Sequence, residues 1–289
     1  MRKLAFITLI VLTCWFAADS ARAAEIRISQ NATAGQPLSI GTGGSGDGTL
    51  YLVGPGQVIK RSIKLGNDVQ IKGEELRSAG RWIAIIRSGS SSESSVFWVK
   101  PGAAESMSFL ARPSRVPVAE RNVISGMVFV FDKSRNLVLQ PTPVNFSLAV
   151  NGSGAAHTVT SRNGLAWIDA GSGPKEGAAQ FVATVGGTSV RRVVQQVASQ
   201  PCNLRMHVSQ RMKDQMVVET DPIRDCTGNA VPDGTIVTFT ESEKNSKSTV
   251  DARIKKGVAR AVLPASSNAT ISVASGIVLG NELHAGGGE

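Results

Sequence analysis

The chain has 289 residues, a formal net charge of +9 at pH 7 and 5% aromatic residues, with a single tyrosine. Its basic residues are spread along the chain, whereas a nucleic-acid-binding surface needs a dense basic stripe with interleaved aromatic side chains. Charge and composition therefore exclude nucleic acid as the expected partner and favour general solubility or weak attraction to an anionic cell surface or polysaccharide.

The first 23 residues have the pattern of a secretory signal peptide. Arg2 and Lys3 are basic, residues 4–11 are apolar, and Ala21-Arg22-Ala23 is a small-x-small cleavage pattern. The apolar run is shorter than the ~20 residues that span a bilayer, and no later stretch is long and apolar enough to span one. We therefore expect a mature chain from Ala24 without a transmembrane span, located in the periplasm, on the cell surface or outside the cell. A retained N-terminal membrane anchor is the alternative.

Cysteine usage fits an exported protein. Cys14 lies in the signal peptide, which leaves Cys202 and Cys226. An even pair in an exported chain predicts one disulfide, and two free buried thiols are the alternative. Because the histidines show no ligand spacing, no metal is expected, and no other cofactor is expected either.

The composition predicts an all-β protein. Val, Ile, Thr, Ser and Gly are abundant, and turn signals recur about every ten residues, as in a sandwich or barrel. Residues 24–100 are expected to form a first sandwich, in which Trp82 alternates onto the same face as Ala84 and Ile86 and is therefore placed in the core. Ser88–Ser95 is predicted to be a polar hairpin loop. The predicted strands are residues 25–29, 38–40, 50–53, 58–63, 80–86 and 96–99.

Residues 104–198 are expected to form a second sandwich. Apolar and polar residues alternate from Val144 to Val150, as in a strand with one face on a core. Asp132–Asn136 is predicted to be a turn, because Asp and Asn side chains bond the local backbone. Asn163-Gly164 is predicted to be a tight turn. The predicted strands are residues 122–131, 144–150, 165–168, 180–185 and 190–197.

Residues 200–284 are expected to form a third sandwich that repeats the second. At a constant offset of 225 − 132 = 93 residues, Asp132 matches Asp225 and Phe146 matches Phe239 without a gap. A fixed period of this length indicates a duplicated small β-domain. Residues 285–289 are predicted to be a flexible tail. The predicted strands are residues 203–208, 216–219, 235–240, 257–263, 269–274 and 277–279.

The repeated pattern resembles the bacterial immunoglobulin-like repeats of the invasin and intimin type. The pattern is a strand, Asp-x-x-x-Asn-x-Val, Val-x-Phe, a polar hairpin, Gly-x-Ala and a closing strand, and the resemblance covers residues 115–285. Residues 25–100 resemble such a sandwich only generically. The resemblance implies tandem immunoglobulin-like sandwiches that act as spacer or adhesive modules, and it implies no catalytic residue. It rests on Asp132, Asn136, Val138, Val144, Phe146, Gly164 and Ala166, and on Asp225, Asn229, Val231, Val237, Phe239, Gly257 and Ala259.

Three motifs allow a second interpretation. Gly41-x-Gly43-x-x-Gly46 matches a dinucleotide fingerprint, but a strand rather than a helix follows it, so a turn is expected. Asp132 and Asp225 could be calcium ligands, yet basic residues flank them and turn capping is preferred. The tryptophans could form a sugar-stacking platform. We favour core positions for them and keep Trp98 and Trp167 as the candidate sugar contacts.

The sequence supports three functional hypotheses. The leading one is a non-enzymatic module that docks to another envelope or surface protein, or to polysaccharide, through hairpin loops and free sheet edges. The second is a carbohydrate-binding protein that uses exposed tryptophans. The third is an enzyme with a site at a domain interface. No catalytic residue is expected, because His157 and His207 are interpreted as surface or edge residues and no nucleophile or metalloprotease motif occurs.

Overall fold

The computed structural model describes residues 25–244, 246–264 and 266–285, so the predicted signal peptide lies outside the described residues. These residues form β-strands and one short 3₁₀ turn, with no α-helix among them. Over the same ranges, no helix has the length and apolar character that crossing a membrane requires. The chain divides into one compact unit that ends at Gly102 and a second that begins at Ala103.

The first unit is a two-sheet sandwich. A three-stranded sheet has the order β1-β3-β6 and a five-stranded sheet has the order β2-β8-β7-β4-β5. Trp82, Ala84 and Ile86 are all fully buried between them, which confirms the predicted alternation. The strands are β1 (Ile26–Ile28), β2 (Asn31–Thr33), β3 (Leu38–Thr42), β4 (Asp47–Gly54), β5 (Gln57–Lys64), β6 (Val69–Ile71), β7 (Gly80–Ser88) and β8 (Ser91–Lys100).

Two turns of the first unit test the sequence interpretation. Gly41 lies in β3, whereas Gly43 and Gly46 lie in the turn between β3 and β4, so a strand does follow the motif and the turn interpretation is confirmed. The predicted loop at Ser88–Ser95 is wrong for most of its length, because β8 begins at Ser91 and pairs along β7. Serine is not among the residues that are enriched in strands. The neighbouring strand nevertheless supplies backbone partners that no local pattern reveals.

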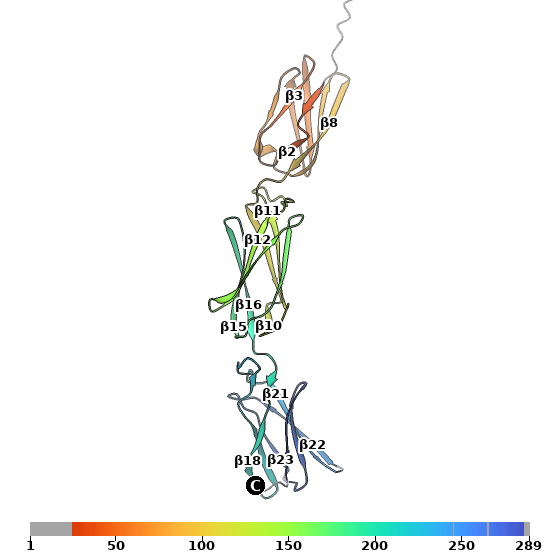
Figure 1. Cartoon of the computed structure of the whole chain (residues 1–289). Helices are drawn as coiled ribbons and strands as arrows, with labels where there is room; N and C mark the ends of the chain where they lie inside the picture. The colour runs from red at the N-terminus through yellow and green to blue at the C-terminus, as the bar shows by residue number, and fades with distance from the viewer. Residues whose placement is uncertain (1–24, 245, 265, 286–289) are drawn as a thin grey trace, which may run out of the picture. The chain divides into compact units, whose positions relative to one another are not determined.

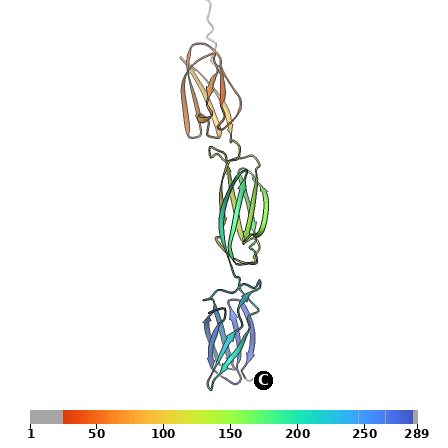
Figure 2. The same ribbon diagram turned by 90° about the vertical axis from the view of Figure 1, so that its left-hand side faces the viewer.

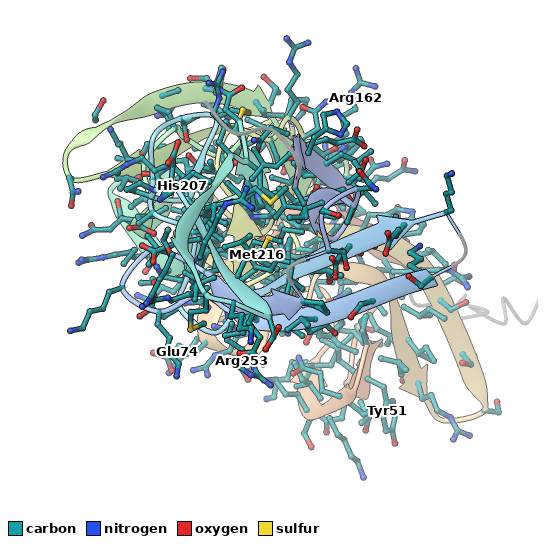
Figure 3. The ribbon with its side chains drawn as sticks, turned by 90° about the horizontal axis from the view of Figure 1, so that it is seen from below. Tyr51, Glu74, Arg162, His207, Met216 and Arg253 are labelled. Carbon is teal, nitrogen blue, oxygen red and sulfur yellow. A yellow bond between two sulfur atoms is a disulfide. The ribbon has the colours of Figure 1, made fainter. Side chains whose placement is uncertain are left out.

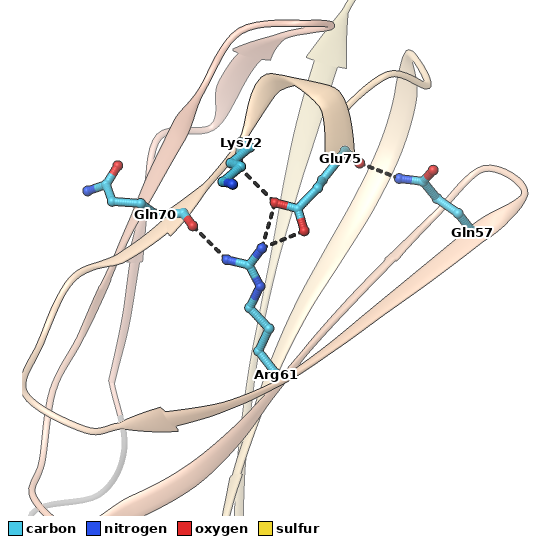
Figure 4. A network of polar contacts seen from close by, with 5 residues as sticks. All are labelled: Gln57, Arg61, Gln70, Lys72 and Glu75. Carbon is cyan, nitrogen blue, oxygen red and sulfur yellow. Dashed lines mark hydrogen bonds and ion pairs between the residues drawn. The ribbon is translucent and has the colours of Figure 1, made fainter.

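A polar network closes one side of the first sandwich (Figure 4). Arg61 of β5 donates to the Gln70 carbonyl oxygen of β6 at 2.7 Å and to the carboxylate of Glu75. The Lys72 N–H donates to Glu75 Oε2 at 3.0 Å, and the Gln57 side chain donates to the Glu75 carbonyl oxygen at 2.6 Å. The bond from Arg61 is the largest cause that lowers the pKa of Glu75. Since β5 and β6 are edge strands, the network ties the two sheets together.

The second unit contains two further sandwiches, and the earlier one has sheets in the orders β14-β11-β9 and β10-β16-β15-β12-β13. Figures 1 and 2 show its strands running up and down the sandwich between turns at both ends. The strands are β9 (Ser106–Arg112), β10 (Arg115–Pro117), β11 (Ile124–Phe131), β12 (Pro143–Val150), β13 (Ser153–Thr160), β14 (Leu165–Ala170), β15 (Gly177–Val185) and β16 (Thr188–Val197). The sequence pattern did not predict β9, β10 or β13.

Three phenylalanines form the centre of this second core. Phe109, Phe146 and Phe181 come from three strands of the two sheets, with ring centroids 5.1–6.1 Å apart. Gly126 of β11 makes room for them, because a Cβ there would lie 2.5 Å from Phe181 Cζ. Such spacing is favourable for aromatic pairs, so the cluster stabilises the sandwich beyond its buried area.

The third sandwich has sheets in the orders β18-β19-β23 and β22-β21-β24-β25, and a separate short pair is formed by β17 and β20. Met216 is buried in its core, whereas His207 on the adjacent strand β18 is exposed (Figure 3). The strands are β17 (Pro201–Cys202), β18 (Met206–Arg211), β19 (Gln215–Thr220), β20 (Arg224–Asp225), β21 (Ile236–Glu243), β22 (Ser246–Arg253), β23 (Arg260–Pro264), β24 (Thr270–Ser275) and β25 (Val278–His284).

The duplicated pattern occupies equivalent places in these two sandwiches. Phe146 on β12 and Phe239 on β21 are both buried. Strand β12 pairs with β13 and β15, and strand β21 pairs with β22 and β24 in the same way. Asn163 has a φ of 50° and Gly164 a φ of 78°, as the predicted tight turn requires. At the matched position Lys256 and Gly257 have φ values of 54° and 81°.

The two aspartates cap turns, as expected. Asp132 Oδ1 accepts hydrogen bonds from the backbone N–H groups of Ser134 at 2.9 Å and Asn136 at 2.8 Å. Asp225 Oδ1 accepts from Thr227 and Asn229 at 2.9 Å each. Burial opposes ionisation of Asp225, but these bonds, together with those from the Asn229 and Thr227 side chains, outweigh it and lower the pKa to about 2.

Acid is expected to weaken the third sandwich through Asp225. Its folded pKa of about 2 lies below the ordinary value of 3.8, so the ionised turn stabilises the fold above pH 3.8, and this contribution disappears as the pH falls through 2. With Asp225 only 4% exposed, the contribution is about 2 kcal/mol. Urea denaturation of the chain and of Asp225→Asn should show a stability difference that shrinks between pH 4 and pH 2. An unchanged difference over that range would contradict the assignment.

The disulfide between Cys202 and Cys226 is present, with the two Cα atoms 4.9 Å apart. It links β17 to the residue after β20, as expected from the cysteine pair. The predicted tail starts too early, because Ala285 is buried and its N–H donates to the Ala269 carbonyl oxygen. Residues 286–289 of that tail lie outside the described residues. The domain boundaries 104–198 and 200–284 remain a proposal, which two separate cores in the second unit support.

Candidate docking surfaces

Three large apolar side chains lie in one row across the outer face of the sheet β14-β11-β9. In the strand register Trp167 of β14 is opposite Met127 of β11, and Met127 is opposite Leu110 of β9. Their exposed fractions are 56%, 37% and 49%. We call Leu110, Met127 and Trp167 the tryptophan row.

The position of the row follows from strand alternation. Ala166 and Val128, one residue away from row members, are buried in the sandwich core, so Trp167 and Met127 must face outward. Single exposed apolar residues are ordinary on protein surfaces, but contiguous ones mark interaction sites. Next to the row, Ser125 Oγ donates to Asp169 Oδ1 at 2.6 Å, which gives the patch a polar border.

The first unit has a comparable patch on the outer face of its five-stranded sheet. Val58, Val53, Ile83 and Val96 are opposite one another across β5, β4, β7 and β8. Trp98 lies two residues after Val96 on the same outer face, is 55% exposed, and is opposite Arg81 of β7. Among the described residues, each unit therefore presents one exposed tryptophan beside aliphatic side chains.

The preference for core positions is wrong for two of the three tryptophans that follow the predicted signal peptide. Trp82 is buried, and its indole N–H donates to the Ser78 carbonyl oxygen at 2.9 Å. Strand neighbours point to opposite faces of a sheet, and in both sandwiches the other sheet covers the face that carries Phe97 or Ala166. Trp98 and Trp167 lie on the opposite faces and are therefore exposed. Trp98 belongs to the first unit and Trp167 to the second, so neither unit contains both candidate sugar contacts.

The polar residues considered for catalysis lie on the surface. His157 of β13 and His207 of β18 are exposed, as predicted, and His207 Nδ1 is 3.3 Å from Asp221 Oδ1. In the part of the chain that the structure describes, no group of three or more His, Cys, Asp or Glu residues could hold a metal ion. The hypothesis of an enzyme site at a domain interface stays untested.

No family model matches the sequence, and no curated protein matches it either. Among solved structures, the Escherichia coli adhesin FdeC aligns over 91% of this chain and 96% of its own, with a TM-score of 0.56 and 13% identity. The chain therefore has the immunoglobulin-like fold of this adhesin. The sequence resemblance to these immunoglobulin-like repeats is therefore confirmed at the level of the fold.

Two further structures are more distant. The bacterial integrin-binding protein invasin aligns over 89% of this chain and 57% of its own, with a TM-score of 0.47 and 12% identity. The FN1–FN3 domains of chicken CNTN1 align over 90% of this chain and 95% of their own, with a TM-score of 0.41 and 10% identity.

Proposed function

We propose that the chain is an exported, non-catalytic protein of the cell envelope whose immunoglobulin-like modules dock to another envelope or surface protein. The tryptophan row is the observation that carries the proposal. It exposes a tryptophan, a methionine and a leucine on adjacent strands, and tryptophan and methionine are enriched at protein interfaces. The adhesive role of FdeC and the integrin binding of invasin are consistent with it.

The sheet face suits this role. Trp167, Met127 and Leu110 lie on strands that pair on both sides of β11, so the backbone beneath them needs no ordering on binding. A tryptophan at the centre of an interface is a frequent hot spot, and its truncation costs about 2 kcal/mol or more of binding free energy. Trp167 is therefore the residue whose loss should weaken docking most.

The Trp167→Ser substitution is expected to lower binding of the chain from Ala24 to its native envelope at least about tenfold. Labelled protein is titrated onto immobilised envelope preparations, with and without protease treatment of the envelopes. The matched control is Val193→Ser, since Val193 is 57% exposed in the same sandwich but lies on the other sheet. Binding that is lost with Val193→Ser and retained with Trp167→Ser would refute the docking role of the row.

Carbohydrate binding is the second candidate, and the exposure of Trp98 and Trp167 favours it. An exposed indole can stack on a sugar ring while polar neighbours bond its hydroxyl groups. Arg81 beside Trp98 and Asp169 near Trp167 could serve as those neighbours. In the envelope titration, binding that survives protease and is competed by soluble polysaccharide would favour this candidate over the protein partner.

A further inference from the structure

The second sandwich contains an open cavity between the edge strands of its two sheets. The cavity has a volume of about 600 Å³ and lies between β13 on one side and the end of β14 with the loop 171–175 on the other. Phe146, Leu148 and Phe181 form its apolar floor. A volume of this size is in the range of ligand-binding pockets.

The cavity exists because the inner face of β13 carries small or polar side chains. Ala155 is opposite Leu148, and His157 is opposite Phe146, and both β13 residues are exposed. In the first sandwich the side between edge strands β5 and β6 is closed by Arg61, which reaches Gln70 and Glu75 (Figure 4). The second sandwich has alanine and histidine on its edge strand instead, and Leu148 stays partly exposed beside the buried Phe146 and Phe181.

Gln196 places a side-chain oxygen without a hydrogen-bond partner in this cavity. Its side chain lines the cavity and is 1% exposed, and its Oε1 has no hydrogen-bond partner within the described residues. The loop passes close by, since a Cβ on Gly173 would lie 3.4 Å from that oxygen. A buried carbonyl oxygen without a donor is costly, so a bound group that presents an O–H or N–H there would be favoured.

The free backbone of β13 lies beside the cavity. β13 is the last strand of its five-stranded sheet, so its outer N–H and C=O groups have no strand partner in the described part of the chain. Such an edge can accept an added strand, whose alternate side chains then point toward the sandwich interior. A ligand that fits this site would therefore combine a backbone that pairs with β13, an apolar group that packs on the cavity floor, and a hydrogen-bond donor for Gln196 Oε1.

We propose that an extended peptide segment of a partner protein pairs with β13 and inserts a tyrosine or tryptophan side chain into this cavity. The aromatic ring contacts Phe146, Leu148 and Phe181, and the O–H or N–H at its far end donates to Gln196 Oε1. These two side chains combine an apolar body with a donor at the tip, which is what the cavity walls require. The site is separate from the tryptophan row and goes beyond the docking function proposed above.

The test begins with a phage library of random short peptides selected on the chain from Ala24. Enriched sequences are expected to contain tyrosine or tryptophan in an alternating pattern, and synthetic copies are then titrated. Gln196→Leu removes the acceptor, and Ala155→Trp fills the opening from an exposed position, so each should weaken peptide binding at least about tenfold. The control is Gln195→Leu, because Gln195 lies on the same strand and faces solvent; it should bind normally.

Two further arms define the mode of binding. Peptides N-methylated at alternate residues keep their side chains but cannot pair with a strand edge, so they should lose binding. Trp167→Ser should leave peptide binding unchanged, which separates this site from the tryptophan row. The proposal is overturned if no peptide is enriched, if Gln196→Leu and Ala155→Trp both bind as the unmodified chain does, or if N-methylated peptides or free p-cresol bind equally well.

Discussion

Replacing Phe146 with alanine is expected to unfold the second sandwich before the rest of the chain. Phe146 is buried, and its ring centroid lies 6.0 Å from that of Phe109 and 6.1 Å from that of Phe181. Truncation of a buried phenylalanine costs about 3–5 kcal/mol, because transfer energy is lost and a cavity remains. For a sandwich of this size the melting temperature should fall by roughly 15 °C or more.

Hydrogen exchange with mass spectrometry is the appropriate measurement, because a chain with several cores does not unfold in one two-state transition. Protection should decrease in β9–β16 and stay unchanged in β1–β8. Phe239→Ala is the matched variant and should move the loss to the third sandwich, where Phe239 is buried on β21. Leu139→Ala changes an exposed side chain and should have an effect within about 0.5 kcal/mol. Equal loss of protection in all segments would contradict independent cores.

Removing the disulfide is expected to destabilise the third sandwich selectively. Cys202 and Cys226 are separated by 24 residues, and closing a loop of that length stabilises the fold by about 3 kcal/mol in the chain-entropy model. The double variant Cys202→Ser/Cys226→Ser should therefore have a lower free energy of unfolding in this sandwich. The β17-β20 pair, which the disulfide joins, should exchange its amide hydrogens first.

Chemical reduction supplies the control for that variant. Treating the unmodified chain with a reductant should reproduce the exchange pattern of the double serine variant, whereas reductant should leave the variant itself unchanged. The first sandwich, whose residues 25–100 contain no cysteine, should be unaffected in both cases. A sandwich that keeps its full stability after both treatments would show that the loop is already constrained by the Asp225 turn.

Much of the architecture was readable because it depends on local chemistry. Asp132 and Asp225 accept hydrogen bonds from backbone N–H groups within four residues of themselves, so a short stretch of sequence is enough to predict each turn. The alternation around Phe146 and Phe239 marks a strand with a buried face, and the constant offset marks a duplication. These features predicted the strands β12 and β21 and the immunoglobulin-like repeat correctly.

Strand β13 and the start of strand β8 were missed because their side chains carry no strand pattern, although each pairs with its hairpin neighbour. β13 is exposed at almost every residue, and Ser91–Ser95 of β8 are polar, so neither has an alternating pattern. Their extended conformation comes from the backbone of β12 and β7, which supply hydrogen bonds along the whole hairpin. A pattern of side chains cannot reveal a strand that its neighbour stabilises through the main chain.

The sequence by itself determined the all-β class, the duplication, the capped turns and the pairing of Cys202 with Cys226. Only the tertiary structure decided which of two apolar faces is covered. Both members of the pair Phe97 and Trp98 are apolar, and so are both members of the pair Ala166 and Trp167, so the alternation pattern cannot tell which one faces the core. The opposing sheet buries Phe97 and Ala166 and leaves the two tryptophans in solvent. Gln196 likewise carries no local signal. Whether a side chain is buried depends on the sheet that packs against its strand, and the packing of the two sheets is set by contacts between residues distant in the chain.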